Sequence, residues 1–330
     1  MLSTFIATLN PLATLFICMG VGFALTKLNI LPKESPKVLS KLVIWVLYPA
    51  LCFITTASYC TPDLLIANSS NLIFACVGLL LSILISLILV RFFAAKSTPE
   101  HGVYRYALTF GNSGYMGDPL VFSIFGDIAL TIYKIFTIPL TFAIYTWGTN
   151  ILTPSEHRKS NPIKQLVNPP TVAIFLGMTV GLCGMGDQLP TFAVSTLNSL
   201  KACMGPVVML MAGSTVAEYS IKSMLTNKKT YIITALRLVF IPSVIISLMY
   251  LIITVANAVF GTDIGNSSLC LMFFTIATPL GLNTVVFPKA YGNDAELGAG
   301  MALISHTLSV ISIPLMFSLM TFLFGEPMLG

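Results

Sequence analysis

The stretch GNSGYMGDPL, residues 111–120, carries three glycines, a proline and an aspartate within an otherwise apolar sequence. Glycine weakens a helix, and a proline inside one costs about 3 kcal/mol because it lacks an N–H and clashes with the carbonyl four residues earlier. At the first turn of a new helix a proline costs almost nothing, and aspartate is a good N-cap. The stretch therefore predicts an interrupted helix that restarts at Asp118 and Pro119.

The whole chain has the composition of a protein embedded in a lipid bilayer. Of its 330 residues, 56% are hydrophobic and 9% are charged, whereas soluble domains carry about 25% charged residues. The net charge of +5 is spread over short loops rather than gathered in one patch, so no nucleic-acid partner is expected. Residues 1–10 lack the basic region and cleavage site of a signal peptide. The composition predicts an all-α integral membrane protein.

Ten apolar segments are long enough to cross a bilayer, whose core of about 30 Å takes about 20 helical residues. The fourth and the ninth are interrupted by glycine and proline. The segments span residues 4–26, 38–57, 71–93, 102–126, 128–151, 169–186, 197–217, 230–257, 267–291 and 295–323.

Basic residues gather in the loops that follow the odd-numbered segments. The other loops hold aspartates, and only Lys201 lies near that side. Because loops rich in lysine and arginine stay in the cytoplasm, we expect a multi-pass protein of the cytoplasmic (cell) membrane with extracytoplasmic N- and C-termini. The longest hydrophilic stretch, 153–168, leaves no room for a soluble catalytic domain.

The two halves of the chain share a pattern. Residues 10–32 and 168–190 have equal length, begin with Asn-Pro and end with Leu-Pro, and DPL at 118–120 answers TPL at 278–280. Since each half holds an odd number of segments, the second half enters the membrane with the opposite orientation, as inverted repeats do. The expected parts are a first five-helix repeat at 1–154, a cytoplasmic linker at 155–168 and an inverted second repeat at 169–330.

Non-helical backbone within a membrane is tolerated only where it is buried in protein or lines a watery cavity, so the two interruptions are expected to meet. Each restarted half-helix would point a partially positive N-terminus into one cavity and favour an anion there. The residues expected to bind substrate are Asn112, Ser113, Asn283 and Thr284. Those expected to form the crossing and its hinges are Gly114, Gly117, Pro119, Pro279 and Gly281.

Three motifs resemble those of the auxin efflux carrier family, which includes the plant PIN carriers and bacterial permeases for small organic acids. GNSGYMGDPLV at 111–121 is similar to the family's fourth-helix motif, ATPLGLNTVVFPKAYGND at 277–294 to its ninth-helix motif, and YPALCF at 48–53 to its second-helix element. The resemblance implies a fold of the bile acid and auxin transporter type, with ten transmembrane helices in two inverted repeats and helices 4 and 9 broken and crossing.

The resemblance also implies a support domain of helices 1, 2, 6 and 7 and a transport domain of helices 3–5 and 8–10. The transport domain would move in an elevator-like manner, and a homodimer would form through the support domains. Asn112 and Asn283 match the family's polar crossing positions and would hold a carboxylate. The long cytoplasmic loop of the plant carriers is missing between the two halves, so a bacterial-type permease is the closer match.

Charged residues within membrane helices are costly and are functional candidates. Asp118 replaces the apolar residue that the family usually has before the crossing proline. At 1.5 Å per residue, Asp118 and Lys134 reach similar depths on adjacent helices, so we expect an ion pair that is either structural or involved in proton coupling. Arg237 either snorkels to the cytoplasmic face or faces the cavity as a counter-ion. His306 either packs between helices or relays a proton.

These features predict a secondary active transporter, not an enzyme, that carries a small organic acid anion linked to H⁺ or Na⁺, without a cofactor or a metal site. The alternative is a sodium-coupled symporter or a cation/proton antiporter of related fold, since Asp118 with Lys134 imitates the Lys-Asp pair of such antiporters. An intramembrane serine protease would need Ser113 with His306 as its base, but would need neither the second interruption nor an inverted repeat. No motif names the substrate or the direction of transport.

Overall fold

The computed structural model is all-helical. It describes residues 2–96, 98–153, 168–260, 266–290 and 295–325. Within these ranges every regular element is a helix, and β-type pairing is limited to one isolated bridge between Gly111 and Leu280. The prediction of an all-α fold is confirmed for this part of the chain.

The helices fall on either side of the predicted linker. Those of the first half are α1 Leu2–Lys27, α2 Ser35–Leu42, α3 Tyr48–Tyr59, α4 Pro62–Ala67, α5 Ser69–Leu89, α6 Pro99–Thr109, α7 Asp118–Phe136, α8 Ile138–Ala143 and α9 Thr149–Leu152. Those of the second half are α11 Pro169–Leu182, α12 Thr191–Glu218, α13 Ile221–Thr226, α14 Lys228–Ala235, α15 Ile241–Phe260, α16 Ser267–Ile276, α17 Asn283–Ala290 and α18 Glu296–Phe324. Short π-helical turns continue several of these helices, at Val43–Leu47, Ser113–Gly117, Ile144–Gly148 and Leu236–Phe240.

Five helical rods in the described residues are long and apolar enough to cross a membrane by themselves. A sixth span results if the bent pair Ile128–Phe136 and Ile138–Leu152, which meet at 46°, counts as one. The rods are Ser35–Tyr59, Ser69–Phe92, Thr191–Glu218, Lys228–Val259 and Glu296–Phe324. The chain is thus a multi-pass membrane protein, while the count of ten spans stays a prediction because several predicted segments are built from shorter helices.

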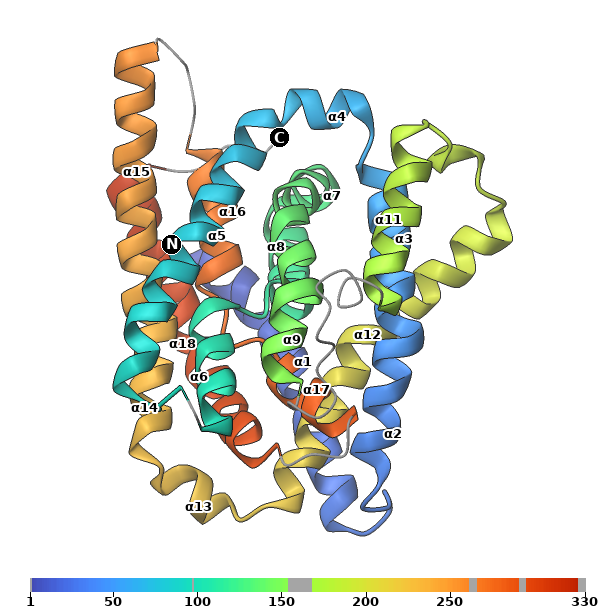
Figure 1. Cartoon of the computed structure of the whole chain (residues 1–330), viewed down its shortest axis with the longest axis vertical. Coiled ribbons are helices and arrows are strands. Elements are labelled where there is room, and N and C mark those ends of the chain that lie inside the picture. The colour runs from blue at the N-terminus through green and yellow to red at the C-terminus, as the bar shows by residue number, and fades with distance from the viewer. Residues whose placement is uncertain (1, 97, 154–167, 261–265, 291–294, 326–330) are drawn as a thin grey trace.

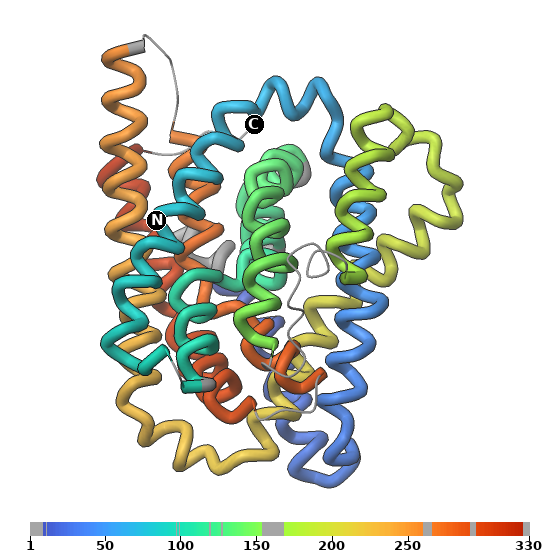
Figure 2. Tube along the Cα trace, viewed as in Figure 1, coloured from blue at the N-terminus to red at the C-terminus, as the bar shows by residue number. Residues whose placement is uncertain are grey.

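The pieces of α7, α8 and α9 run down the middle of the molecule (Figure 1). In that view α5, α6 and α15 lie to their left, and α3 and α11 lie to their right. Figure 2 shows α14 and α15 as one tall rod at the left edge, coloured gold to orange. The helix that follows the first interruption, α7, therefore lies at the centre, with long helices on both sides of it.

Two helix pairs pack with their backbones unusually close, α1 along α12 and α3 along α11. A Cβ added to Gly213 would lie 1.9 Å from the carbonyl oxygen of Met19, and one added to Gly177 would lie 2.1 Å from the hydroxyl of Thr56. Small residues allow such approach between helices in a membrane, where packing rather than hydrophobicity drives association. Contacts between α12 and α3 join the two pairs into one packed group.

The first interruption lies earlier than the sequence predicts. The segment Phe110–Asn112 separates α6 from a helical run that begins at Ser113 with a π-helical turn and continues as α7. Gly117 has helical angles, φ −62 and ψ −46, so Asp118 lies within the run and is not an N-cap. The predicted restart at Asp118 and Pro119 is wrong, because the π-helical turn shifts the hydrogen-bond register and gives a residue without an N–H a place inside a helix.

The second interruption contains the predicted proline but ends later. Residues 277–282 are non-helical between α16 and α17, and the helix restarts at Asn283 rather than at Thr278 and Pro279. Asp118 and Thr278 consequently occupy different places relative to their interruptions. The sequence match between DPL and TPL therefore does not mark equivalent positions.

The two interruptions meet, as predicted. The amide of Asn112 donates to the carbonyl of Pro279 over 2.8 Å, and the amide of Gly281 donates to the carbonyl of Phe110 over 3.1 Å. This antiparallel pairing supplies hydrogen bonds to backbone groups that have left their helices.

Candidate functional site

The point at which Phe110–Asn112 pairs with Pro279–Gly281 is called the crossing. Arg237 stabilises it. Its Nε donates to the carbonyl of Thr278, and its Nη1 donates to the carbonyls of Leu108 and Thr109, each over 3.3 Å. The last carbonyls of a helix lack partners within it, and those of α6 are buried here. Arg237 is itself 1% exposed and does not line the cavity described below. Both alternatives predicted for it, snorkelling and facing the cavity, are wrong.

Gly111 packs directly against the guanidinium group of Arg237. A Cβ at Gly111 would lie 2.1 Å from Nη2 of Arg237 and 2.5 Å from Oγ1 of Thr278. Any side chain would force apart the pairing between the two interruptions. The glycine is therefore needed for close approach, since its own backbone φ is not positive.

A cavity lies next to the crossing, and both interruptions contribute to its wall. Its volume is about 70 Å³, below the roughly 300–1,000 Å³ of pockets for drug-sized ligands but enough for water, an ion or a small molecule. Polar groups from both halves face it. They belong to Tyr48, Thr55, Thr56, Asn112, Ser113, Asp118, Lys134, Thr137, Thr141, Tyr145 and Asn283.

The helical run from Ser113 opens with its first turn at this cavity. Ser113, Gly114 and Tyr115 line the wall, and among the described residues their N–H groups have no backbone acceptor. Free amides and the helix dipole make such a terminus attractive to an anion. This part of the cavity wall is therefore partly positive.

Asn112 joins the crossing to α18. Its Nδ2 lies 3.0 Å from Nε2 of His306, whose Nδ1 lies 2.8 Å from the carbonyl of Ala302. A carbonyl can only accept, so Nδ1 carries the hydrogen and Nε2 accepts from the asparagine. Oδ1 of Asn112 is buried without a hydrogen-bond partner in the described part of the chain. His306 thus contacts a predicted substrate residue, a contact that the sequence does not reveal.

The same contacts bear on the serine protease hypothesis. Both ring nitrogens of His306 are engaged by Asn112 and Ala302, and within the described part of the chain the ring makes no hydrogen bond to Ser113. A nucleophilic serine needs a base within hydrogen-bond reach. The geometry gives this hypothesis no support.

Asn283 lies in the cavity wall with both ends of its amide occupied. Tyr48 donates its hydroxyl to Oδ1 over 2.6 Å, and Nδ2 donates to the hydroxyl of Tyr106 over 2.6 Å. The ring of Tyr48 also packs against Tyr115 and Tyr145, with centroids 5.4 and 5.1 Å apart. Sequence analysis missed Tyr48 and Tyr106 as partners of Asn283, although the YPALCF motif begins at Tyr48.

Thr284 does not reach the cavity. It is fully buried, its hydroxyl donates to the carbonyl of Gly281 over 3.1 Å, and Gly298 of α18 packs against it. Successive residues of a helix point about 100° apart, so when Asn283 faces the cavity Thr284 turns away. Thr284 is thus absent from the lining of the cavity in which it was expected to bind substrate.

The predicted hinge residues have different positions. Pro279 and Gly281 lie in the second interruption and pair with the first. Gly114 and Gly117 are helical, so their prediction as unwinding residues is wrong. Gly114 faces open space at the cavity, while a Cβ at Gly117 would lie 2.3 Å from the hydroxyl of Tyr133.

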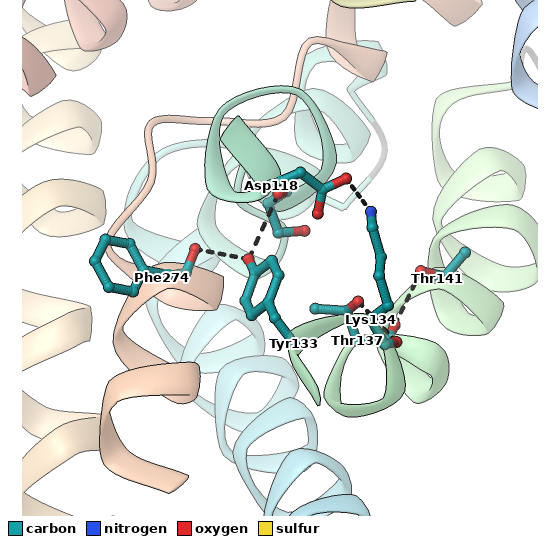
Figure 3. Close-up of polar contacts among 7 residues, drawn as sticks. Asp118, Tyr133, Lys134, Thr137, Thr141 and Phe274 are labelled. Atoms are coloured by element: carbon teal, nitrogen blue, oxygen red, sulfur yellow. Dashed lines mark hydrogen bonds and ion pairs between the residues drawn. The ribbon is translucent and has the colours of Figure 1, made fainter. Parts of the chain in front are cut away.

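The predicted ion pair between Asp118 and Lys134 is present (Figure 3). The helical run turns back at Gly126, whose φ of +83 favours glycine, and each partner lies eight residues from that turn. Both side chains are largely buried, at 14% and 6% exposure. Tyr133 bonds the carbonyls of Phe274 and Ser113 over 3.0 and 3.4 Å, which fixes the returning leg beside the crossing.

The sequence was compared with models of known protein families. The family model described as membrane transport protein matches residues 7–317. The chain belongs to the membrane transport protein family. This confirms the resemblance to auxin efflux carriers and makes the chain a membrane transporter by descent.

Two archaeal proteins are similar to this chain at low identity. An uncharacterized transporter of Methanothermobacter thermautotrophicus is 23% identical over 316 residues, covering 94% of this chain and 98% of the relative. An uncharacterized transporter of Methanocaldococcus jannaschii is 24% identical over 211 residues, covering 62% of this chain and 68% of the relative.

Replacing Gly111 by alanine is expected to destabilise the protein by about 1–3 kcal/mol, since overpacking costs that much and the new methyl group would meet Arg237 and Thr278. Gly114→Ala is the matched control, because a Cβ there meets nothing within 4 Å. Thermal unfolding in detergent should show a lower Tm for the Gly111 variant alone. Equal Tm values would contradict the packing described for Gly111.

Arg237→Lys keeps the charge but loses the planar fork that reaches three carbonyls. Each buried carbonyl left without a donor costs about 1–3 kcal/mol, so the Tm should fall well below that of the wild type. The exposed Arg91→Lys serves as control. A lysine that leaves the Tm unchanged would show that Arg237 does not secure the crossing.

Proposed function

We propose that this protein is a secondary active transporter that moves a small organic acid anion across the cytoplasmic membrane. The observation that carries the proposal is the helix terminus at Ser113, which opens with free amides into a cavity at the meeting point of two interrupted helices. In transporters, discontinuous helices of this kind form the substrate site. A carboxylate would accept from these amides and neutralise the partial charge of the helix end.

The helix packing supports inverted repeats. Under inverted symmetry α11 would be the counterpart of α1, and α12 would be the counterpart of the rod that contains α3. The pairing of α1 with α12 would then correspond to the pairing of α11 with α3. These are the two pairs of closest approach. They would make up the support domain, and the interrupted segments with their neighbours would form the transport domain of an elevator-like mechanism. Both termini would then be extracytoplasmic, and two support domains would form the homodimer.

Asn112 and Asn283 have different roles in this proposal. Asn112 lines the cavity and uses one of its two amide hydrogens on Nε2 of His306, so the second hydrogen would be donated to a carboxylate. Asn283 holds its amide between Tyr48 and Tyr106 and would shape the site. Thr284 has no part in binding.

The ion pair between Asp118 and Lys134 would link transport to H⁺ or Na⁺. Asp118 has one carboxylate oxygen bonded to Lys134 and the other buried without a partner. That second oxygen can accept a proton or contribute to a cation site. The same pair also favours the alternative function, a sodium-coupled symporter or cation/proton antiporter. Transport of a carboxylate would distinguish the proposed function from this alternative.

The proposal is tested with purified protein and a set of mono- and dicarboxylates, first by thermal shift with sodium or potassium at two pH values and then by uptake into proteoliposomes. Asn112→Ala should raise the KM of the accepted acid about tenfold or more, which corresponds to a lost hydrogen bond to a charged group. The exposed Asn198→Ala is the control. Cation exchange with no carboxylate uptake would favour the antiporter instead.

Asp118→Asn separates binding from coupling. The variant should still exchange labelled substrate across the membrane but should lose accumulation driven by a proton or sodium gradient, because the group that exchanges the ion is gone. Lys134 keeps a polar partner in this variant. Gradient-driven accumulation at the wild-type level would show that the pair is structural.

A further inference from the structure

A second, larger cavity lies on the other side of the Asp118–Lys134 pair. Its volume is about 310 Å³, within the usual range for small-molecule pockets. Its wall is built from α1, α3, the π-helical turn Ser113–Gly117, both legs of α7 and the middle of α12. It shares Leu51, Gly114, Tyr115, Asp118, Lys134 and Met204 with the crossing cavity. The ion pair is therefore part of a wall common to both cavities.

Lys201 of α12 lines this second cavity and takes part in neither ion pair found among the described residues. It is partly buried, and its ammonium lies 6.0 Å from the ring centroid of Tyr59, at the outer limit of a cation–π contact. It sits ten residues into a 28-residue apolar helix, which is about 15 Å from the helix start. A charge in such a position is costly unless function requires it.

The charges around the cavity do not balance. Asp118, Lys134 and Lys201 are the charged residues that line it, and the remaining lining is apolar apart from backbone and the ring of Tyr115. Asp118 compensates Lys134, which leaves the charge of Lys201 facing the cavity. Apolar walls lower the local dielectric and strengthen the attraction of this charge for an anion.

The two cavities differ in what they can hold. The crossing cavity of about 70 Å³ is too small for most hydrated organic acids, whereas the second cavity of about 310 Å³ can take one with some of its water. The exposed residues Phe122 and Ala202 border the second cavity, so it reaches the surface of the chain. An acid arriving from outside the protein would meet Lys201 before it met the crossing.

We infer that the second cavity is a binding site for the carboxylate of a small organic acid, with Lys201 as its cation, from which the acid passes the Asp118–Lys134 pair to the crossing. The inference rests on the proposed transport function and adds a residue and a site to it. A carboxylate held at Lys201 can compete with Asp118 for Lys134, which would loosen the common wall. Gly114 lies in that wall and leaves open space where a side chain would stand.

The test compares initial uptake rates in proteoliposomes for wild type, Lys201→Gln and Lys201→Arg. Losing one charge-assisted hydrogen bond should raise the KM of Lys201→Gln about tenfold, with the maximal rate changed less than twofold, while Lys201→Arg stays near the wild type. The exposed lysine variant Lys222→Gln is the matched control. An unchanged KM in folded Lys201→Gln overturns the inference.

A second variant covers the case that Lys201→Gln does not fold. Ala202→Glu places a carboxylate at an exposed position that lines the same cavity and should also raise the KM, because it neutralises the field of Lys201. A KM equal to that of the wild type would overturn the inference as well. If the wild type transports no carboxylate, both the proposed function and the inference are overturned. If the wild type transports a carboxylate and the variants have its KM, only the inference is overturned.

A lipid headgroup offers the same anionic chemistry as a soluble acid. Uptake is therefore measured in liposomes of phosphatidylcholine alone and in liposomes with added phosphatidylglycerol. The inference expects the higher KM of Lys201→Gln in both. A difference between wild type and variant that appears only with phosphatidylglycerol would assign Lys201 to an anionic lipid and overturn the inference.

Discussion

The pairing of two interrupted backbones deep in the protein is the constraint on which the rest of the structure depends. A peptide group that leaves its helix within a bilayer costs several kcal/mol unless it finds another partner. Here Asn112 and Gly281 donate to Pro279 and Phe110, and Arg237 supplies donors to the carbonyls that remain. Because these bonds are made between the segments, the first turn of the helix from Ser113 stays free to face a cavity. A polar site within the membrane is thus a consequence of how the backbone is satisfied.

The hairpin at Gly126 adds charge to that site. By turning the chain back on itself, it places Lys134 opposite Asp118 and lets the hydroxyl of Tyr133 bond the carbonyl of Phe274 across the interruption. The ion pair then forms the wall between a small crossing cavity and a larger one that contains Lys201. A buried pair contributes little net stability because desolvation offsets its attraction. Both partners line both cavities, so the pair is the point at which the two cavities adjoin.

The sequence predicted features that depend on distance along the chain. The Asp118–Lys134 pair followed from equal helical rise on both sides of a turn, and the meeting of the interruptions followed from the cost of unpaired backbone. The restart of the first half-helix was mispredicted, because a π-helical turn at Ser113–Gly117 accommodates Pro119 inside the helix. Thr284 points away from the cavity because its neighbour Asn283 takes the cavity-facing position. Arg237, Tyr48 and Tyr106 could not be assigned, since their partners lie on helices distant in sequence.

By itself, the sequence determined that this chain is a helical membrane protein, where its helices are interrupted to within a few residues, and which family it belongs to. These properties depend on hydropathy, helical rise and backbone chemistry, which are local. Only the tertiary structure decided which atoms of Asn112 and Asn283 are free, that Arg237 braces the crossing, and that Lys201 shares a cavity with the ion pair. Those outcomes depend on how helices from both halves pack around the interruptions, and no spacing along one helix encodes the face that a distant helix will cover.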